Sequence, residues 1–140
     1  MQVLHNIEDF SIPEVIYTLN TEYSEFKDIH FNCSDYRKIN GQYFIYFHRV
    51  YYVLLHNILK HSNVANKSLS ILIKEENEFL IIENSNLFTK DISTQGNGTG
   101  LNFLCNNIKI INSKNTFTKH IEEDCHFFVN LKLIKEDLYN

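Results

Sequence analysis

The sequence predicts an α/β fold in which helices cover one face of a mixed, mostly antiparallel sheet. Apolar residues recur at helical spacing in some segments and at strand spacing in others. The strands also follow one another in consecutive pairs, and such pairs form antiparallel hairpins, so that helices pack most simply on one face. The chain of 140 residues is long enough to bury one real core. We therefore expect a single domain over 1–140.

The first half of the chain predicts two helices separated by a strand. Pro13 suits the first turn of a helix and Ser11 can cap it, which predicts a helix over 13–26. Alternating residues at 29–33 predict a strand. After the turn signal Asn40-Gly41, the stretch 43–61 is apolar and aromatic, with spacing typical of a buried helical face. The residues of that face are Tyr51, Leu54, Leu55, Ile58 and Leu59.

The second half predicts two pairs of strands with a loop and a helix between them. A charged stretch at 74–78 separates the strands of the first pair and predicts a hairpin turn. The predicted elements, in order, are strands at 68–73 and 79–82, a loop at 85–99, a helix at 100–112, and strands at 116–120 and 126–134.

Composition and charge exclude several classes of function. The formal net charge is −4 and no basic block is present, which argues against a nucleic-acid partner. No segment approaches the roughly 20 apolar residues of a membrane span, and the first residues do not read as a signal peptide. Cys33, Cys105 and Cys125 are odd in number and widely spaced, which is typical of reduced, buried thiols in a cytosolic protein. We expect a cytoplasmic chain without a membrane segment of its own.

Three of the four glycines lie within five residues, at Gly96, Gly98 and Gly100. They run directly into the predicted helix, and a helix N-terminus offers unpaired N–H groups and partial positive charge, which suit a phosphate. A glycine-rich surface turn before a helix is the plain alternative. The spacing does not match the dinucleotide fingerprint, and no Lys-Ser or Lys-Thr follows as in a Walker A loop.

Two further segments carry polar residues in apolar surroundings. Asn57, Lys60 and His61 share one side of the predicted helix, where an amide oxygen can ligate Mg²⁺ and a lysine can neutralise a phosphate. The alternative is the solvent face of an amphipathic helix. Asn84 follows a buried strand and could read the exocyclic amine of a purine, although Asn and Ser also favour ordinary turns.

Together, these three segments resemble the GHKL, or Bergerat-type, ATP-binding family of sensor histidine kinases, type II topoisomerases, a heat-shock chaperone and mismatch-repair ATPases. The run 54–62 (LLHNILKHS) looks like the N-box, 82–84 (IEN) like the first glycine box, and 93–101 (STQGNGTGL) like the second. The resemblance covers nearly the whole chain. It is closest to the catalytic domain of sensor histidine kinases, of the quorum-sensing receptor type.

The resemblance implies a two-layer α/β sandwich that binds ATP with Mg²⁺. It implies that Asn57 is the metal ligand, and that Asn84 stands where the family usually has an adenine-reading Asp. The implied partner is a phosphoacceptor histidine domain or protein that receives the γ-phosphate. The implied nucleotide-binding residues are Asn57, Lys60, His61, Asn84, Thr94, Gly96, Gly98, Thr99, Gly100 and Leu101.

The chain departs from the family pattern at several positions. Val53 lies one helical turn before Asn57, where ATPases of the family carry a Glu base, and valine cannot accept a proton. Ser85 and Leu87 stand where glycines are usual, which makes the first glycine box degenerate. His48 lacks the acidic neighbour and the downstream proline of a phosphoacceptor motif.

These departures lead us to expect a histidine-kinase-like phosphotransferase domain with little or no intrinsic ATPase activity and with no catalytic side chain of its own. The chain would be a nucleotide domain alone, either a piece of a larger kinase or a stand-alone relative. One alternative is a degenerate, non-catalytic module for nucleotide sensing or protein contacts. Another is an anti-sigma-type serine kinase, although such kinases usually keep the Glu that is Val53 here.

Overall fold

The computed structural model describes residues 8–61, 66–87, 99–123 and 126–139. Five strands form one sheet in the order β1-β2-β3-β5-β4. β1 runs parallel to β2, and the other neighbouring strands are antiparallel. The elements are α1 (Ile12–Glu22), β1 (His30–Asn32), α2 (Phe44–His61), β2 (Ser68–Glu76), β3 (Phe79–Leu87), α3 (Thr99–Ile111), β4 (Thr116–Glu122), β5 (His126–Ile134) and α4 (Lys135–Leu138).

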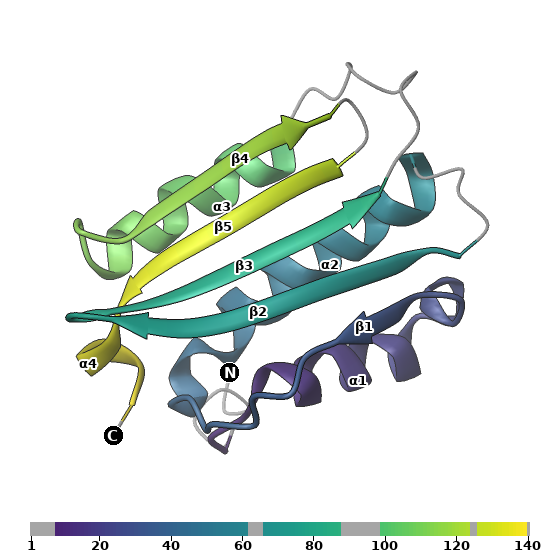
Figure 1. Cartoon of the computed structure of the whole chain (residues 1–140). Helices are drawn as coiled ribbons and strands as arrows, with labels where there is room; N and C mark the ends of the chain where they lie inside the picture. The colour runs from purple at the N-terminus through teal and green to yellow at the C-terminus, as the bar shows by residue number, and fades with distance from the viewer. Residues whose placement is uncertain (1–7, 62–65, 88–98, 124–125, 140) are drawn as a thin grey trace.

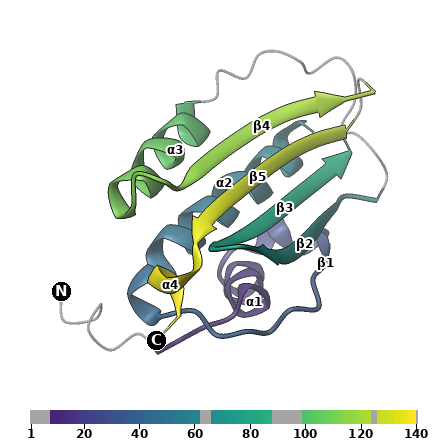
Figure 2. The ribbon, with the colours of Figure 1, turned by 60° about the vertical axis from the view of Figure 1, so that its left-hand side comes forward.

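The helices α1, α2 and α3 lie together on one face of the sheet, and the described helices leave its other face open (Figures 1 and 2). α2 lies between α1 and α3 and packs against both. The predicted fold class, a two-layer α/β arrangement with a mixed, mostly antiparallel sheet and helices on one face, is confirmed.

The core fills the space between the helices and the sheet. Alternate residues of β3 and β5 are buried there, because successive side chains of a strand point to opposite faces. Leu59 is only half-buried, whereas the other residues of the predicted apolar face on α2 are buried as expected. The buried residues of α2 beyond its first turn, each at most 2% exposed, are Val50, Tyr51, Leu54, Leu55 and Ile58.

The first predicted helix is shorter than expected. α1 begins at Ile12, and the Ser11 backbone N–H donates to Glu14 Oε1 at 3.3 Å, as in a capping box. α1 ends at Glu22, and a separate 3₁₀ turn follows at Ser24–Phe26. This turn buries Phe26 completely. Burial of that ring therefore accounts for the break in what the sequence suggested was one helix.

The first hairpin is longer and tighter than predicted. β2 continues to Glu76, so the turn consists of Asn77 and Glu78 rather than 74–78. Asn77 takes a φ of 57°, a left-handed conformation that asparagine tolerates better than most residues. β3 continues to Leu87, past the predicted end at 82, and α4 is a short helix that the sequence did not indicate.

The cysteines differ from expectation in their burial. Cys33 and Cys105 are free thiols, as predicted, but each is half-buried rather than buried. Both lie against the edge of the hydrophobic core. Cys125 lies outside the described residues. In the described part of the chain, no helix combines the length and the apolar character that crossing a membrane would require.

Candidate functional site

The candidate site lies at one end of the sheet, where three elements converge. α2 and β3 end there, and α3 begins toward the same end, beside β4 (Figure 1). The register of the sheet places the end of β3 beside the start of β5, because Phe79 pairs with Ile134 whereas Leu87 pairs with His126. The described parts of two of the segments that the sequence singled out, 54–61 and 99–101, therefore lie toward the end of the molecule at which β3 ends.

The last two turns of α2 carry the predicted polar residues. Asn57 is half-buried and Lys60 is exposed, so both can be reached from solvent. No hydrogen bond joins the Asn57 amide to another described residue. His61 is the last residue of α2, and its side chain lies outside the described part of the structure. The amide oxygen of Asn57 is therefore available as a ligand for a hard cation such as Mg²⁺.

Val53 lies one turn before Asn57 on α2 and is half-buried. It packs against the edge of the core with part of its surface open. A valine side chain can neither accept a proton nor orient a water molecule. The helix position that precedes Asn57 by one turn therefore offers no base.

Asn84 is placed differently from the sequence prediction. It lies inside β3 rather than at its end, because Ser85, Asn86 and Leu87 continue to pair with β5. The Asn84 side chain is 1% exposed. Its Nδ2 donates to the carbonyl oxygen of Val129 at 2.9 Å, and its Oδ1 accepts from the hydroxyl of Tyr51 at 3.0 Å.

The first turn of α3 contains the end of the predicted glycine segment. α3 begins at Thr99, one residue before the predicted start, so Gly100 and Leu101 have helical backbone. The first N–H groups of a helix have no partner within the helix and can bind an anion. Thr94, Gly96 and Gly98 lie outside the described residues. Their predicted role stays a prediction.

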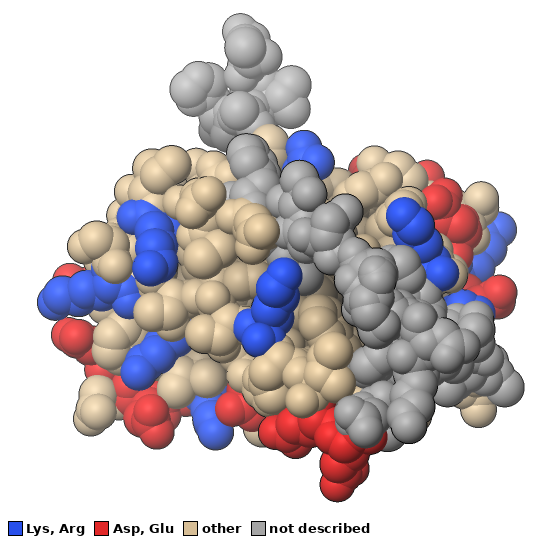
Figure 3. Space-filling view, turned by 90° about the horizontal axis from the view of Figure 1, so that it is seen from above, with Lys and Arg blue, Asp and Glu red and all other residues tan. Residues whose placement is uncertain are grey.

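The described residues contain no group of three or more His, Cys, Asp or Glu side chains that could hold a metal ion. Asn57 offers one amide oxygen at this end, and Mg²⁺ is commonly held by one or two protein oxygens together with phosphate oxygens and water. Figure 3 views the molecule from above, and on that face the lysines and arginines are scattered, with uncharged and acidic residues between many of them. This distribution differs from the continuous basic patch typical of nucleic-acid binding.

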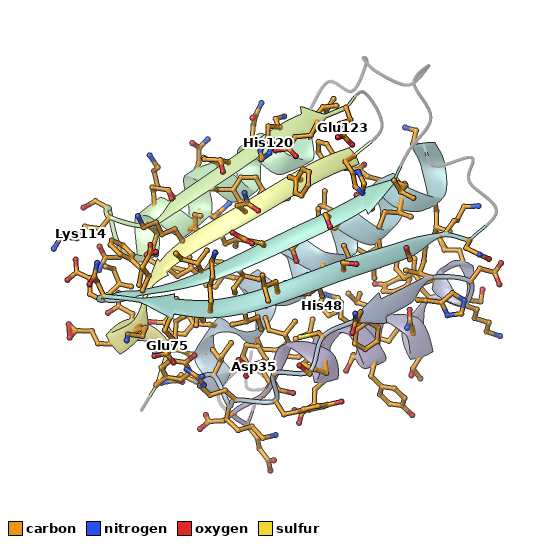
Figure 4. All side chains as sticks on the ribbon, viewed as in Figure 1. Asp35, His48, Glu75, Lys114, His120 and Glu123 are labelled. Carbon is orange, nitrogen blue, oxygen red and sulfur yellow. The ribbon has the colours of Figure 1, made fainter. Side chains whose placement is uncertain are left out.

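The opposite end of the sheet is held by an ion-pair network. The guanidinium of Arg37 pairs with Glu75 and lies 3.8 Å from Asp35, and the Lys135 ammonium lies 3.2 Å from the same Glu75 carboxylate. Figure 4 shows Glu75 beside α4, with Asp35 further along below β2. The side chain of Arg37 is 45% exposed, so these pairs contribute little stability individually. They tie the loop before α2 to the end of the chain.

Tyr51 is the residue of the site region whose polar role the sequence analysis missed. The apolar spacing of α2 predicts that its side chain is buried, and its ring is indeed fully buried. Its hydroxyl, however, is the hydrogen-bond donor to Asn84. A signal was available, because a buried tyrosine usually finds a partner for its hydroxyl. No signal in the sequence indicated which residue is the partner, since Asn84 lies 33 residues further along the chain.

Comparison with known proteins supports the fold. No family model matches the chain, and no curated protein matches it. Histidine kinase AdeS from Acinetobacter baumannii superimposes with a TM-score of 0.65 at 13% identity, covering 92% of this chain and 67% of that one. The histidine kinase domain of the blue-light-activated kinase EL346 from Erythrobacter litoralis superimposes with a TM-score of 0.64 at 11% identity. The match covers 98% of this chain and 74% of that one. The chain has the fold of histidine kinase domains. At these identities the likeness concerns the fold alone.

Proposed function

We propose that this chain binds adenine nucleotide together with Mg²⁺ and presents the γ-phosphate to a histidine on another domain or chain. The observation that carries the proposal is the convergence of the end of α2, the end of β3 and the start of α3 at one end of a histidine-kinase-like sheet. The proposed binding residues are Asn57, Lys60, His61, Asn84, Thr94, Gly96, Gly98, Thr99, Gly100 and Leu101.

Each element would make a distinct contribution to binding. The Asn57 amide oxygen would ligate Mg²⁺, which bridges phosphate oxygens and neutralises their charge when it is bound. The exposed ammonium of Lys60 would lie near the phosphates as a point charge. The backbone N–H groups at the start of α3 would hold a phosphate directly. Phosphoryl transfer needs mainly positioning and charge neutralisation, so the absence of a base at Val53 is compatible with it.

A second candidate function is a non-catalytic module that senses nucleotide or binds a protein. Two observations favour it: Val53 is apolar at the position before Asn57, and the Asn84 amide already has two protein partners. The two candidates differ in whether the γ-phosphate is transferred. Incubating the chain with labelled ATP and a histidine-containing phosphoacceptor domain separates them, because only the first predicts label on the acceptor.

Gly100→Ala is expected to weaken nucleotide binding without lowering stability. Gly100 has helical backbone in the first turn of α3, where alanine is favoured over glycine by up to about 1 kcal/mol. A phosphate that approaches this backbone closely would meet the new methyl group, so the affinity for ATP should fall while the melting temperature rises or stays unchanged. Calorimetry measures both quantities.

The matched control for Gly100→Ala is Asn106→Ala, at an exposed position further along the same helix. This control should leave ATP binding unchanged. If Gly100→Ala binds ATP as tightly as the wild type, the start of α3 is not the phosphate site and the proposed position of the nucleotide is wrong.

A further inference from the structure

A cavity lies at the end of the sheet opposite the candidate site. It is lined by residues of the β2–β3 hairpin, of the turn between α3 and β4, of α4 and of the loop that contains Arg37. Its volume is about 480 Å³, within the roughly 300–1,000 Å³ typical of small-molecule sites. Figure 4 shows Lys114 and Glu75, which both line the cavity, at this end of the molecule. The proposed nucleotide site uses none of these residues.

Hydrogen bonds between elements that are distant in the sequence hold the walls of the cavity in place. Asn115 is 2% exposed, and its amide donates to the Ile108 carbonyl at 3.0 Å and accepts from the Ile134 N–H at 2.9 Å. The Lys135 N–H donates to the Glu78 carbonyl at 2.9 Å, which joins α4 to the hairpin. Because these bonds already order the walls, a ligand would not have to pay for ordering them.

Four charged groups on one side of the cavity neutralise one another. The Arg37 guanidinium pairs with Glu75 and lies 3.8 Å from Asp35. The Lys135 ammonium lies 3.2 Å from the same Glu75 carboxylate. Two cations thus face two carboxylates, and this side of the cavity offers no net charge to a ligand.

Three other charged groups that line the cavity have no ion-pair partner among the described residues. They are the Lys114 ammonium and the carboxylates of Glu78 and Glu136. All three side chains are exposed, so a ligand can reach them. A complementary ligand carries one anionic group and two cationic groups. An amino acid with a basic side chain has this set, in its carboxylate, its α-ammonium and its side-chain cation.

We propose that this cavity binds a free amino acid with a basic side chain, such as arginine or lysine. Its carboxylate would lie at Lys114, and its two cationic groups would lie at Glu78 and Glu136. Ile134 and the Tyr139 ring also line the cavity and offer apolar surface to the aliphatic part of the ligand. An acidic amino acid would bring two carboxylates toward Glu78 and Glu136 and is disfavoured by like charge. This site is separate from the proposed nucleotide site and goes beyond it.

Binding is expected to be weak and sensitive to salt. The three charged groups are exposed, and ion pairs with exposed groups contribute little individually because water and salt screen them. The dissociation constant for arginine should therefore be on the order of millimolar, and it should rise with ionic strength.

NMR titration of the full chain with arginine tests the inference. Lys114→Ala should weaken arginine binding by about two- to fivefold. The same substitution should not weaken binding of agmatine, which has the two cationic groups of arginine but no carboxylate. Glu136→Gln should weaken binding of both ligands, because each carries the cation that this carboxylate contacts. Lys109→Ala is the matched control for Lys114→Ala, since Lys109 is exposed on α3 outside the cavity, and it should change neither affinity.

Three results would overturn the inference. The first is an absence of shifts around the cavity at arginine concentrations well above the millimolar range. The second is glutamate binding as tightly as arginine, because the charge match would then have no effect. The third is Lys114→Ala weakening arginine and agmatine equally, because the carboxylate would then not contact Lys114. The titration contains no nucleotide, so these results leave the proposed function untouched.

Discussion

Asn84→Asp is expected to lower the free energy of unfolding by about 3 kcal/mol or more at neutral pH. The substitution replaces the nitrogen that donates to the Val129 carbonyl with an oxygen, so that two acceptors face each other at a site that is 1% exposed. It also introduces a negative charge into the core, and a buried charge without a partner is costly. The hydroxyl of Tyr51 can donate to only one carboxylate oxygen and cannot compensate for both effects.

The pH dependence of this variant follows from the same burial. Desolvation raises the pKa of a buried carboxyl above its unfolded value of about 3.9. An elevated pKa in the folded state means that the folded protein binds the proton more tightly. The destabilisation relative to wild type should therefore be smallest below about pH 4 and should grow as the pH rises toward the folded-state pKa.

Urea denaturation at several pH values measures the effect of Asn84→Asp. The control is Asn86→Asp, which adds the same charge two residues further along β3, where the side chain is only half-buried. The control should lose much less stability. An Asn84→Asp protein as stable as the wild type at pH 7 would show that the hydrogen bond from Asn84 to the Val129 carbonyl does not persist in solution.

ATP hydrolysis by the purified chain is expected to be at or near the uncatalysed background. A positioned general base contributes about 10²–10⁴-fold to a reaction of this type. Val53 occupies the helix position one turn before Asn57 and cannot supply that contribution. Transfer of the γ-phosphate to a histidine can still occur, because positioning and Mg²⁺ carry most of that reaction. The chain should thus bind nucleotide well and turn it over slowly.

A pair of substitutions at position 53 tests this prediction. Val53→Glu introduces a carboxylate at a half-buried position, whereas Val53→Gln introduces a side chain of the same shape without a base. We expect phosphate release to increase only in Val53→Glu. Brisk release by the wild type that is abolished by Asn57→Ala would mean that a base acts from another position.

The sequence was sufficient to predict the fold class, because its signals are local. The apolar spacing of α2 is confirmed by the burial of Tyr51, Leu54 and Ile58. The end of β3 was predicted wrongly for a non-local reason. Asn84, Ser85 and Asn86 favour turns in isolation, but in the structure they pair with Val129, Phe128 and Phe127 of β5. Pairing with a strand more than 40 residues away overrides the local preference.

The same distinction applies to the candidate site. The position of Asn57 on a helix is predictable, because it depends on the helical repeat of its own segment. The partners of Asn84 are not, because they lie on α2 and β5 and are brought together only by the packing of helix on sheet. The sequence could thus indicate that Asn84 is unusual beside an apolar strand, but it could not indicate that the amide bonds to Tyr51 and to Val129.

Isothermal titration calorimetry with ATP, in the presence and absence of Mg²⁺, tests the central claim most directly. The wild type should bind ATP more tightly with Mg²⁺ than without it. In Asn57→Ala the ratio of these two affinities should be smaller by at least about tenfold, which corresponds to about 1.4 kcal/mol. Asn106→Ala, an exposed substitution on α3, should retain the gain. The result that would contradict the account is a wild-type protein that gives no heat with ATP or ADP under either condition, or an Asn57→Ala protein whose response to Mg²⁺ equals that of the wild type.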